Sequence, residues 1–309
     1  MKDYSKLPVK GGQWRSTEES VGQRKKLAGG LRTAGQKKKS EPGKPLVSIV
    51  TIVLNDETNI NKTIDSVLQQ SYSPIEYIII DGGSQDNTIG VIRQYDVDVD
   101  YWCSEPDKGI SDAFNKGILA ATGDYIGILN AGDWYEKDAT EKMVEAFQSD
   151  PSLGVVCGAL QFWHGTEREF ICQSVPHLLE RDMTVTHPSC FVRSEVYHTY
   201  GLFGEQYKLA MDYELLLRFK KQGVKFAALN IVLTNMQHSG TSEINWKKAL
   251  DETHRARKIL LKSSFFASTS YYYFILAKRF LRIFMENFGL NSVIGFYRSR
   301  LALVKKRRP

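Results

Sequence analysis

The sequence predicts an α/β fold with a mostly parallel central sheet flanked by helices. Two observations support this prediction. The segment 46–54 is almost entirely apolar and β-branched, which is typical of a strand buried on both faces rather than one with a solvated side. Strand-like and helix-like segments then alternate as far as residue 129, and such alternation is typical of right-handed βαβ units.

Each further element follows from a local pattern. Asn55-Asp56 is expected to cap a helix whose buried stripe is Ile60, Ile64, Val67 and Leu68, at helical spacing. The other elements of this half are strands at 75–80, 97–102 and 124–129, a helix ending near residue 94, and a helix with the stripe Ala113, Phe114, Gly117, Ile118 and Ala121. After residue 147 two β segments are expected, at 153–163 and 168–174, with no second βαβ series.

Charge is distributed unevenly along the 309 residues. Residues 1–45 carry 12 basic and 4 acidic side chains, and residues 255–309 carry 13 and 1. The centre, 46–254, carries 16 basic and 30 acidic side chains, a net charge of −14. Such a centre repels phosphate unless a cation is present, so the overall charge of +6 does not indicate a nucleic-acid-binding protein.

We therefore expect three regions. Residues 1–45 are rich in Gly, Lys, Gln and Ser without apolar periodicity, and are predicted to be a disordered basic tail with no secretory signal. Residues 46–254 form the α/β domain, and residues 255–309 a basic helical extension. The four cysteines show no C-x-x-C spacing, which favours reduced thiols in the cytoplasm over a zinc site or a disulfide framework.

Polar residues follow each predicted strand of the first half. They are Asn55, Asp81, the loop 104–109, and the segment from Asn130 to Asp133. A helix cap or an Asx-turn explains any one of them alone, but ligands of parallel α/β sheets bind beyond the carboxyl ends of the strands, where all four converge. We therefore predict a ligand crevice at this edge of the sheet.

The crevice contains neither of the common phosphate-binding motifs. The first strand is followed by Asn-Asp-Glu rather than G-x-G-x-x-G, and no G-x-x-x-x-G-K-[ST] is present. An acidic crevice can instead hold a diphosphate through a divalent cation, Mg²⁺ or Mn²⁺, bound by oxygen ligands. Asp133 is the best-placed ligand.

Several motifs in order along residues 46–240 resemble glycosyltransferase family 2. They are Leu46 to Leu54, Asn55 to Glu57, Glu76 to Thr88, Ser104 to Gly117, and Leu129 to Asp133. The resemblance implies a GT-A fold, a divalent metal and a nucleotide-sugar donor, for which a UDP-sugar is expected. It also implies transfer of a hexosyl or N-acetylhexosaminyl group with inversion at the anomeric carbon. The acceptor is expected to be a glycan or a lipid-linked glycan.

The resemblance also implies roles for individual residues. Asp81 would accept a hydrogen bond from the donor base, and Lys108 and Gly109 would lie along the ribose and diphosphate. Asp133 would bind the metal at the position of the family's D-x-D motif, although Asn130 and Gly132 stand where Asp is common. The remaining candidates are Thr51, Asn55 and Glu57 in the base pocket, Asn115 and Lys116 behind the diphosphate, and Asn130 beside Asp133. His238 is expected as a second metal ligand, although a lone histidine is more commonly structural.

On the acceptor side, Asp212 shares a helical stripe with Leu215, Leu216 and Phe219. Spacing alone leaves a helix cap and a functional carboxylate equally plausible, and the resemblance favours the catalytic base. Glu214 points elsewhere and can pair with Arg218. His187-Pro188-Ser189 is similar to an acceptor-region motif of the family.

The carboxyl end has a basic amphipathic pattern. The uncharged run 263–277 is shorter than the roughly 20 residues a transmembrane helix needs. Beyond it, Lys278, Arg279 and Arg282 share one helical arc, opposite Leu276, Phe280, Ile283 and Phe284. The pattern fits a solvated helix on the core, or a helix in an anionic membrane interface on the inner face of the cell membrane.

The sequence thus predicts a metal-dependent, inverting glycosyltransferase of surface polysaccharide or glycolipid assembly, with Asp212 as general base. The alternative is a non-catalytic nucleotide-sugar-binding protein, which the incomplete Asn-Ala-Gly-Asp motif leaves open. A nucleic-acid partner is not expected, because no recognition motif accompanies the basic ends.

Overall fold

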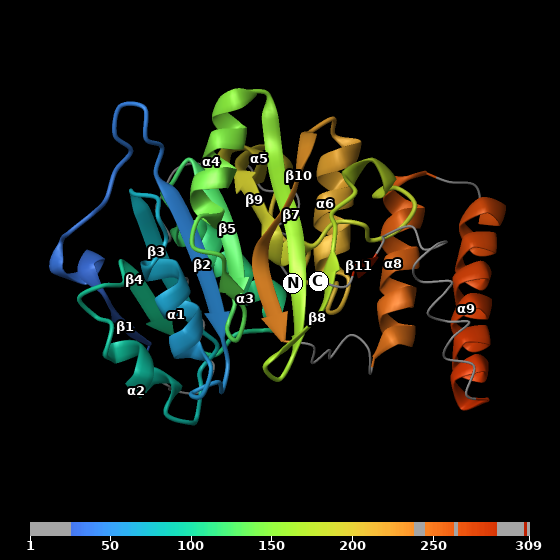
Figure 1. Ribbon diagram of the computed structural model, residues 1–309, viewed down its shortest axis with the longest axis horizontal. Helices are drawn as coiled ribbons and strands as arrows, with labels where there is room; N and C mark the ends of the chain where they lie inside the picture. Colours follow the sequence, from blue (N-terminus) through green and yellow to red (C-terminus); the bar gives the residue numbers. More distant parts are fainter. Residues whose placement is uncertain (1–25, 238–244, 263–264, 289–305, 308–309) are drawn as a thin grey trace.

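The computed structural model describes residues 26–237, 245–262, 265–288 and 306–307 (Figure 1). The described strands form one mixed sheet in the order β1-β4-β3-β2-β5-β9-β7-β10-β6, and β8 pairs with β7 off this path. The strands of the first half are β1 Leu27–Gly29, β2 Val47–Val53, β3 Ile75–Asp81, β4 Tyr101–Ser104, β5 Tyr125–Asn130 and β6 Trp134–Tyr135. Those of the second half are β7 Leu153–His164, β8 Glu167–Cys172, β9 Cys190–Arg193, β10 Lys225–Gln237 and β11 Lys306–Arg307.

Helices cover the sheet on both faces and continue beyond its end. In the first half they are α1 Ile60–Leu68, α2 Thr88–Arg93, α3 Ile110–Ala120 and α4 Ala139–Ser149. In the second half they are α5 Ser194–Tyr200, α6 Met211–Lys221, α8 Trp246–Leu260 and α9 Phe265–Asn287. Short 3-10 turns occur at Leu31–Ala34, Pro176–Leu178 and His187–Ser189.

The centre of the sheet is parallel, as predicted. Strand β2 runs parallel to β3 on one side and to β5 on the other, and β3 runs parallel to β4. Antiparallel β9 then joins β5 to β7, and β7 and β10 form a second parallel pair. The carboxyl ends of β2 to β5 therefore meet at one edge, where the sequence predicts the ligand crevice.

The strands are apolar throughout because both faces of the sheet are buried. Alternate residues of β2 point to opposite cores: Val50 packs with α3, α5 and α6, and Ile49 with α1, α2 and α4. The expected stripe of α3 is buried except for Ala121, which caps the helix and is partly buried; that of α1 is buried except for Leu68, which is exposed. Val97 is exposed as well, and the strand expected from residue 97 begins only at Tyr101.

The prediction that residues 1–45 form one disordered tail is wrong for residues 26–45. Strand β1 pairs with β4 at the edge of the sheet, and Arg32 and Lys38 form ion pairs with the buried carboxylates of Glu76 and Asp100. Composition concealed this order, because each cation finds its partner 44 or 62 residues further along the chain.

The predicted boundary at 254/255 falls inside the continuous helix α8. Ala256, beyond the boundary, is fully buried in the core that contains α6. Helix α9 lies beside α8 at the far end of the molecule from β1 (Figure 1). Among the described residues, no helix combines the length and the apolar character needed to cross a membrane.

Candidate functional site

The loops after β2 and β3 are tied together by backbone and side-chain hydrogen bonds. Asn55, which has a φ of 52°, accepts a hydrogen bond at Oδ1 from the Gln85 N–H at 2.8 Å, and its own N–H donates to Ser84 Oγ at 2.8 Å. Glu57 Oε2 accepts from the Asn87 N–H at 2.7 Å. Both Asn55 and Glu57 are exposed at the crevice edge, where the sequence places them.

Asp81, at the end of β3, is completely buried and organises the next loop. Its Oδ2 accepts hydrogen bonds from the backbone N–H groups of Gly83 and Ser84, both at 2.9 Å, and from Ser104 Oγ at 2.7 Å. Its Oδ1 accepts from the Ser84 hydroxyl. In this structure the carboxylate therefore faces the loop 82–84 and β4 rather than the open crevice predicted for it.

The loop 104–109 lies against the loop after β3. Pro106 packs on Gly83, whose φ of +88° favours glycine, and a side chain at position 82 would collide with the Asp107 carboxylate. Gly109 begins α3 at a φ of 116° and donates its N–H to Asp107 Oδ1 at 2.8 Å. Lys108 has an exposed side chain. The structure therefore brings Lys108 and Gly109 to the predicted edge.

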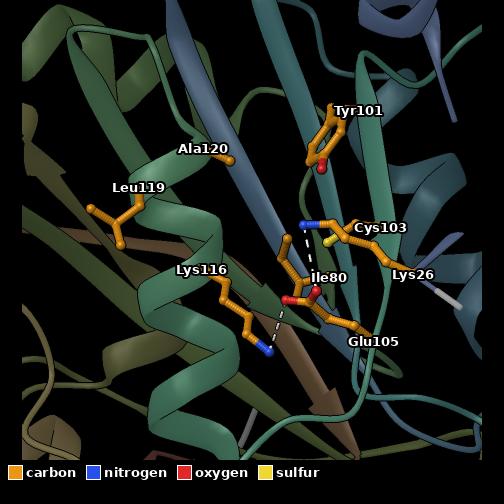
Figure 2. A pocket seen from close by; sticks show the side chains of 8 residues that line it. All are labelled: Lys26, Ile80, Tyr101, Cys103, Glu105, Lys116, Leu119 and Ala120. Atoms are coloured by element: carbon orange, nitrogen blue, oxygen red, sulfur yellow. Dashed lines mark ion pairs between the residues drawn. The ribbon is translucent and has the colours of Figure 1, made fainter. Parts of the chain in front are cut away.

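Lys116 does not point into the crevice. Its ammonium lies 3.1 Å from Glu105 and 3.2 Å from Asp112, and it lines a cavity of about 70 Å³ beside α3 (Figure 2). Burial alone would lower the pKa of Lys116, but Asp112 and Glu105 together raise the pKa above its ordinary value. Figure 2 shows Glu105 between Lys116 and Lys26, so Lys116 anchors the start of the loop rather than its ligand-facing side.

Thr51 and Asn115 are also placed behind the crevice. Thr51 is fully buried in β2 and accepts a hydrogen bond from the Tyr77 hydroxyl at 3.0 Å. The Asn115 side chain makes two hydrogen bonds with the backbone of Phe203. Its Nδ2 donates to the Phe203 carbonyl at 3.0 Å, and its Oδ1 accepts from the Phe203 N–H at 2.9 Å. Asn115 was expected behind the diphosphate, and Thr51 was expected in the base pocket. In this structure both side chains bond to neighbouring protein groups, because sequence spacing does not determine which way a buried polar side chain points.

Asp133 has a buried carboxylate oxygen without a partner. The residue is 5% exposed, and its Oδ2 finds no hydrogen-bond donor within the described part of the chain. Burial raises the pKa of Asp133 to about 8, while a hydrogen bond with the Asn130 side chain opposes the shift. A buried carboxylate oxygen of this kind needs a proton or a cation, so the donor set fits a divalent metal.

The other metal ligand predicted from the sequence, His238, lies outside the described residues. Within the described ranges, no group of three or more His, Cys, Asp and Glu side chains is arranged to hold a metal ion. Within the described residues, Asp133 would thus be the one predicted protein ligand of a bound cation, and oxygen atoms of a ligand or of water suit the other positions.

Asp212 is the second residue of α6, half-buried in its first turn. Burial raises the pKa of Asp212 to about 6, while a hydrogen bond from the Tyr213 N–H to its Oδ1 at 2.7 Å opposes the shift. As predicted, Glu214 pairs instead with Arg218 at 2.9 Å, and both side chains are buried. The carboxylate of Asp212 is thus the unpaired one of the two and is suited to exchange a proton near neutral pH.

The His187 ring is buried among Phe114 and Phe203, with ring centroids 5.7 and 5.5 Å away. Burial lowers the pKa of His187 to about 4, so the imidazole is neutral at physiological pH. Cys190 follows on β9, and its thiol interacts electrostatically with Asp212. This segment therefore packs close to α6 on the second half of the sheet.

Two tryptophans lie next to Asp133. Trp134 on β6 and Trp163 at the end of β7 have ring centroids 5.6 Å apart, and both are half-buried. The Lys62 ammonium lies over the Trp134 ring, and the Arg168 guanidinium over the Trp163 ring. An open groove of about 380 Å³ runs from Trp134 along α1. Sequence analysis did not identify this pair, because nothing in the spacing 134 to 163 indicates contact.

Two further residues at the site were not predicted. The Lys208 ammonium donates to the Lys108 carbonyl at 3.0 Å, and Glu252 of α8 accepts hydrogen bonds from the backbone just before α6. Both contacts join segments more than 40 residues apart. A single sequence carries no signal for such pairs.

Comparison with solved structures defines the fold. A mannosyltransferase of Pyrobaculum calidifontis in complex with GDP-Man and Mn²⁺ superposes with a TM-score of 0.57 at 16% identity, over 76% of this chain and 70% of the other. Staphylococcus aureus TarS 1–349 in complex with UDP-GlcNAc gives 0.55 at 15% identity, over 69% and 65%. The described chain thus has the fold of the GT-A glycosyltransferases.

The chain belongs to glycosyltransferase family 2: the profile of Glycosyl transferase family 2 matches residues 48–209. An uncharacterized glycosyltransferase of Mycobacterium tuberculosis is 32% identical over 179 residues, 56% of this chain and 68% of the relative. The chondroitin synthase of Pasteurella multocida is 28% identical over 239 residues, 71% of this chain but 23% of the synthase. The protein is accordingly a glycosyltransferase, and its similarity extends to enzymes that make polysaccharides.

Proposed function

We propose that this glycosyltransferase moves a hexosyl or N-acetylhexosaminyl group from a UDP-sugar to a glycan or lipid-linked acceptor, with inversion, in surface polysaccharide or glycolipid assembly. The observation that carries the proposal is the buried Asp133 Oδ2, which has no hydrogen-bond partner in the described part of the chain and follows β5 where β5 ends beside β2. The complexes of related folds with UDP-GlcNAc and GDP-Man support a nucleotide-sugar donor, and the synthase relative supports a polysaccharide product.

Asp133 would hold the metal, Mn²⁺ or Mg²⁺, with Asn130 orienting its carboxylate. The bound cation would supply charge stabilisation for the departing nucleoside diphosphate. On the donor side, Asn55 and Glu57 would contact the nucleoside, and Lys108 and the N–H groups that begin α3 would lie along the diphosphate. Asp81, fully hydrogen-bonded, would act by fixing the loop 82–84.

Asp212 would be the general base. As the acceptor oxygen forms its bond to the anomeric carbon, the bond from that carbon to the diphosphate oxygen breaks on the opposite face, and the hydroxyl proton passes to the Asp212 carboxylate. A pKa near 6 keeps this carboxylate ionised at neutral pH while leaving it basic enough to take the proton.

The acceptor would lie across Trp134 and Trp163. Aromatic faces offer large apolar surfaces with a defined orientation, and Lys62 and Arg168 at the two rings supply donors for hydroxyl groups. Trp134 directly follows Asp133 in the sequence and lines the open groove along α1, which offers room for an extended acceptor.

A panel of nucleotide sugars with Mn²⁺ tests the proposal. Thermal stabilisation selects the donor, and release of nucleoside diphosphate then measures turnover. Asp133→Ala should lose turnover and the Mn²⁺-dependent part of donor binding, whereas the exposed Asp138→Ala is a matched control that should keep both. Equal release by wild type and Asp133→Ala would contradict the metal assignment. No release by wild type with any acceptor tried, despite donor binding, would favour the non-catalytic binding protein.

We also propose that α9 attaches the enzyme to the cytoplasmic face of an anionic membrane. Several large apolar side chains of α9 and its end are more than half exposed: Tyr273, Phe274, Phe280, Leu281, Phe284 and Phe288. Residues 255–309 carry 13 basic and 1 acidic side chains, which complements an anionic surface. Arg279, expected on a solvated basic arc, instead lies over the Trp246 ring of α8, whereas Lys278 of the same arc is exposed.

A further inference from the structure

Helix α8 contacts the chain immediately before Asp212. The Glu252 carboxylate accepts hydrogen bonds from three successive backbone N–H groups, those of residues 208, 209 and 210, at 2.8 to 3.0 Å. Ala210 is the N-cap residue of α6, and Asp212 is the second residue of that helix. A charged acceptor makes stronger bonds than a neutral one, so these contacts hold the start of α6 firmly.

The same helix also contacts the residue immediately after Asp212. Arg257 Nη1 donates to the Tyr213 hydroxyl at 3.0 Å and to the Arg181 carbonyl at 3.0 Å, and its guanidinium stacks over the Tyr271 ring at 3.9 Å. Tyr213 is 1% exposed, so its hydroxyl has little freedom to find another partner. Asp212 is thus bracketed by two side chains of α8.

Apolar packing and these polar contacts together place α8. Ala256 is fully buried in the core that contains α6, and Leu260 packs against the same core while partly buried. The segment that Glu252 holds also reaches the donor side, because the Lys208 ammonium donates to the Lys108 carbonyl at 3.0 Å. The Glu252 carboxylate therefore fixes a segment that contacts the loop at Lys108 and leads into α6, the helix that carries Asp212.

We propose that Glu252 and Arg257 are positioning residues that hold Asp212 in register with the donor. The inference rests on the proposed role of Asp212 as base and extends the machinery beyond residue 209, where the match to the family ends. Catalysis depends on the placement of the base to within about 1 Å, and a displacement of that size costs about 100-fold in rate. Freeing the residues on either side of Asp212 permits such a displacement.

The test is a double-mutant cycle on nucleoside-diphosphate release, with the donor selected by the panel and Mn²⁺. Glu252→Gln should lower kcat by about 10- to 100-fold with little change in donor KM. In an Asp212→Asn background the same substitution should cost nothing further, because a residue that acts only through Asp212 has no effect once that carboxylate is gone. Additive losses would overturn the inference.

Controls separate positioning from folding. Asp251→Asn removes a neighbouring carboxylate of α8 that accepts from Tyr272 on α9 at 2.8 Å, and it should leave kcat unchanged. Tyr213→Phe deletes only the hydroxyl that Arg257 contacts, and it should lower kcat without altering the melting temperature. This variant keeps the proposal testable if Glu252→Gln folds poorly. Normal kcat in both Tyr213→Phe and a folded Glu252→Gln would refute the proposal.

Failure of the proposed function gives a different result. If Asp212→Asn turns over at the wild-type rate, Asp212 is not the base and the positioning role falls with it. If Asp212→Asn is defective but Glu252→Gln and Tyr213→Phe are normal or additive, the base assignment stands and the positioning inference alone is wrong.

Discussion

Asp212 combines a raised pKa with a position at the start of a helix. The positive end of the α6 dipole favours an ionised carboxylate there, yet burial outweighs it and raises the pKa to about 6. With a pKa near 6, the Asp212 carboxylate is ionised at neutral pH and is still basic enough to accept a proton, as a general base requires.

Asp212→Asn should retain donor binding while transfer falls by about 100-fold or more, because the amide cannot take the acceptor proton. The check is kcat beside the donor dissociation constant. In the wild type, log kcat should also fall below about pH 6 as Asp212 becomes protonated, and this limb should disappear in the variant. Near-normal transfer by Asp212→Asn would exclude the base assignment.

The same substitution, Asp212→Asn, should raise the free energy of unfolding although it lowers the rate of transfer. The pKa of Asp212 is about 6 in the folded chain and 3.8 ordinarily, so between these values the folded state binds more protons. The wild type therefore loses stability as pH rises through this window. Asp212→Asn should be more stable than wild type at pH 8, by about 1–3 kcal/mol, with no such gain below pH 4. Urea unfolding at both pH values measures the difference, and a less stable variant at pH 8 contradicts the linkage.

Among single residues, the pattern of parallel strands predicts which residues reach the edge of the sheet, but not which way their side chains point. Asn55, Lys108 and Asp133 stand at the predicted edge because the ends of parallel strands must meet there. Thr51 and Asn115 belong to the same motifs, but their side chains bond to Tyr77 and Phe203. Those partners are 26 and 88 residues away, so local spacing holds no information about them.

At the scale of elements, the segment 26–45 shows how a low-complexity composition can conceal order. The Glu76 carboxylate is buried and also accepts from Ser48 Oγ at 2.5 Å and from the Thr122 N–H at 2.8 Å. Arg32 supplies the cation and donates a second bond to the Ala120 carbonyl at 2.7 Å. Ion pairing thus fixes a segment that contains little apolar surface, whereas the apolar strands β2, β3 and β5 were predictable from their residues alone.

Arg32→Met should lower the free energy of unfolding by about 3–5 kcal/mol, because it leaves the buried Glu76 charge without its cation. The exposed Lys37→Met is the matched control and should change stability by less than about 0.5 kcal/mol. Denaturant unfolding measures both. Adding Glu76→Gln to Arg32→Met should recover part of the loss, and a wild-type midpoint for Arg32→Met alone would show that β1 and its turn do not depend on this pair.

On the scale of the whole molecule, the acidic crevice and the basic carboxyl end are joined through α8. This helix touches α6 on one side and α9 on the other, where Asp251 accepts from the Tyr272 hydroxyl at 2.8 Å. The net charge of −14 in the centre suits a metal-dependent site, and the excess of 12 positive charges over residues 255–309 suits an anionic surface. The proposed metal site and the proposed membrane surface would thus lie on opposite sides of α8.

If α9 inserts its outward face into a membrane, Phe274, Phe280 and Phe284 should dominate the binding. They are 64%, 51% and 56% exposed, and burying such side chains in the interface stabilises attachment by about 1.5–3 kcal/mol each when complete. The triple substitution to Ser should therefore weaken binding to vesicles of phosphatidylcholine and phosphatidylglycerol by more than about 100-fold in co-sedimentation. Truncation after residue 262 should abolish it.

The control for that experiment is Val97→Ser, which removes an apolar side chain that is 76% exposed at the opposite end of the sheet and should leave vesicle binding unchanged. Vesicles of phosphatidylcholine alone should bind the wild type more weakly, because the basic residues of 255–309 then lack anionic lipid to attract them. Equal binding of the triple variant and the wild type would exclude α9 as the attachment site. Phe280 also packs edge-on against Trp246 of α8, with ring centroids 6.1 Å apart, so turnover of a soluble nucleotide sugar is measured beside vesicle binding to show that the triple variant keeps α8 in place.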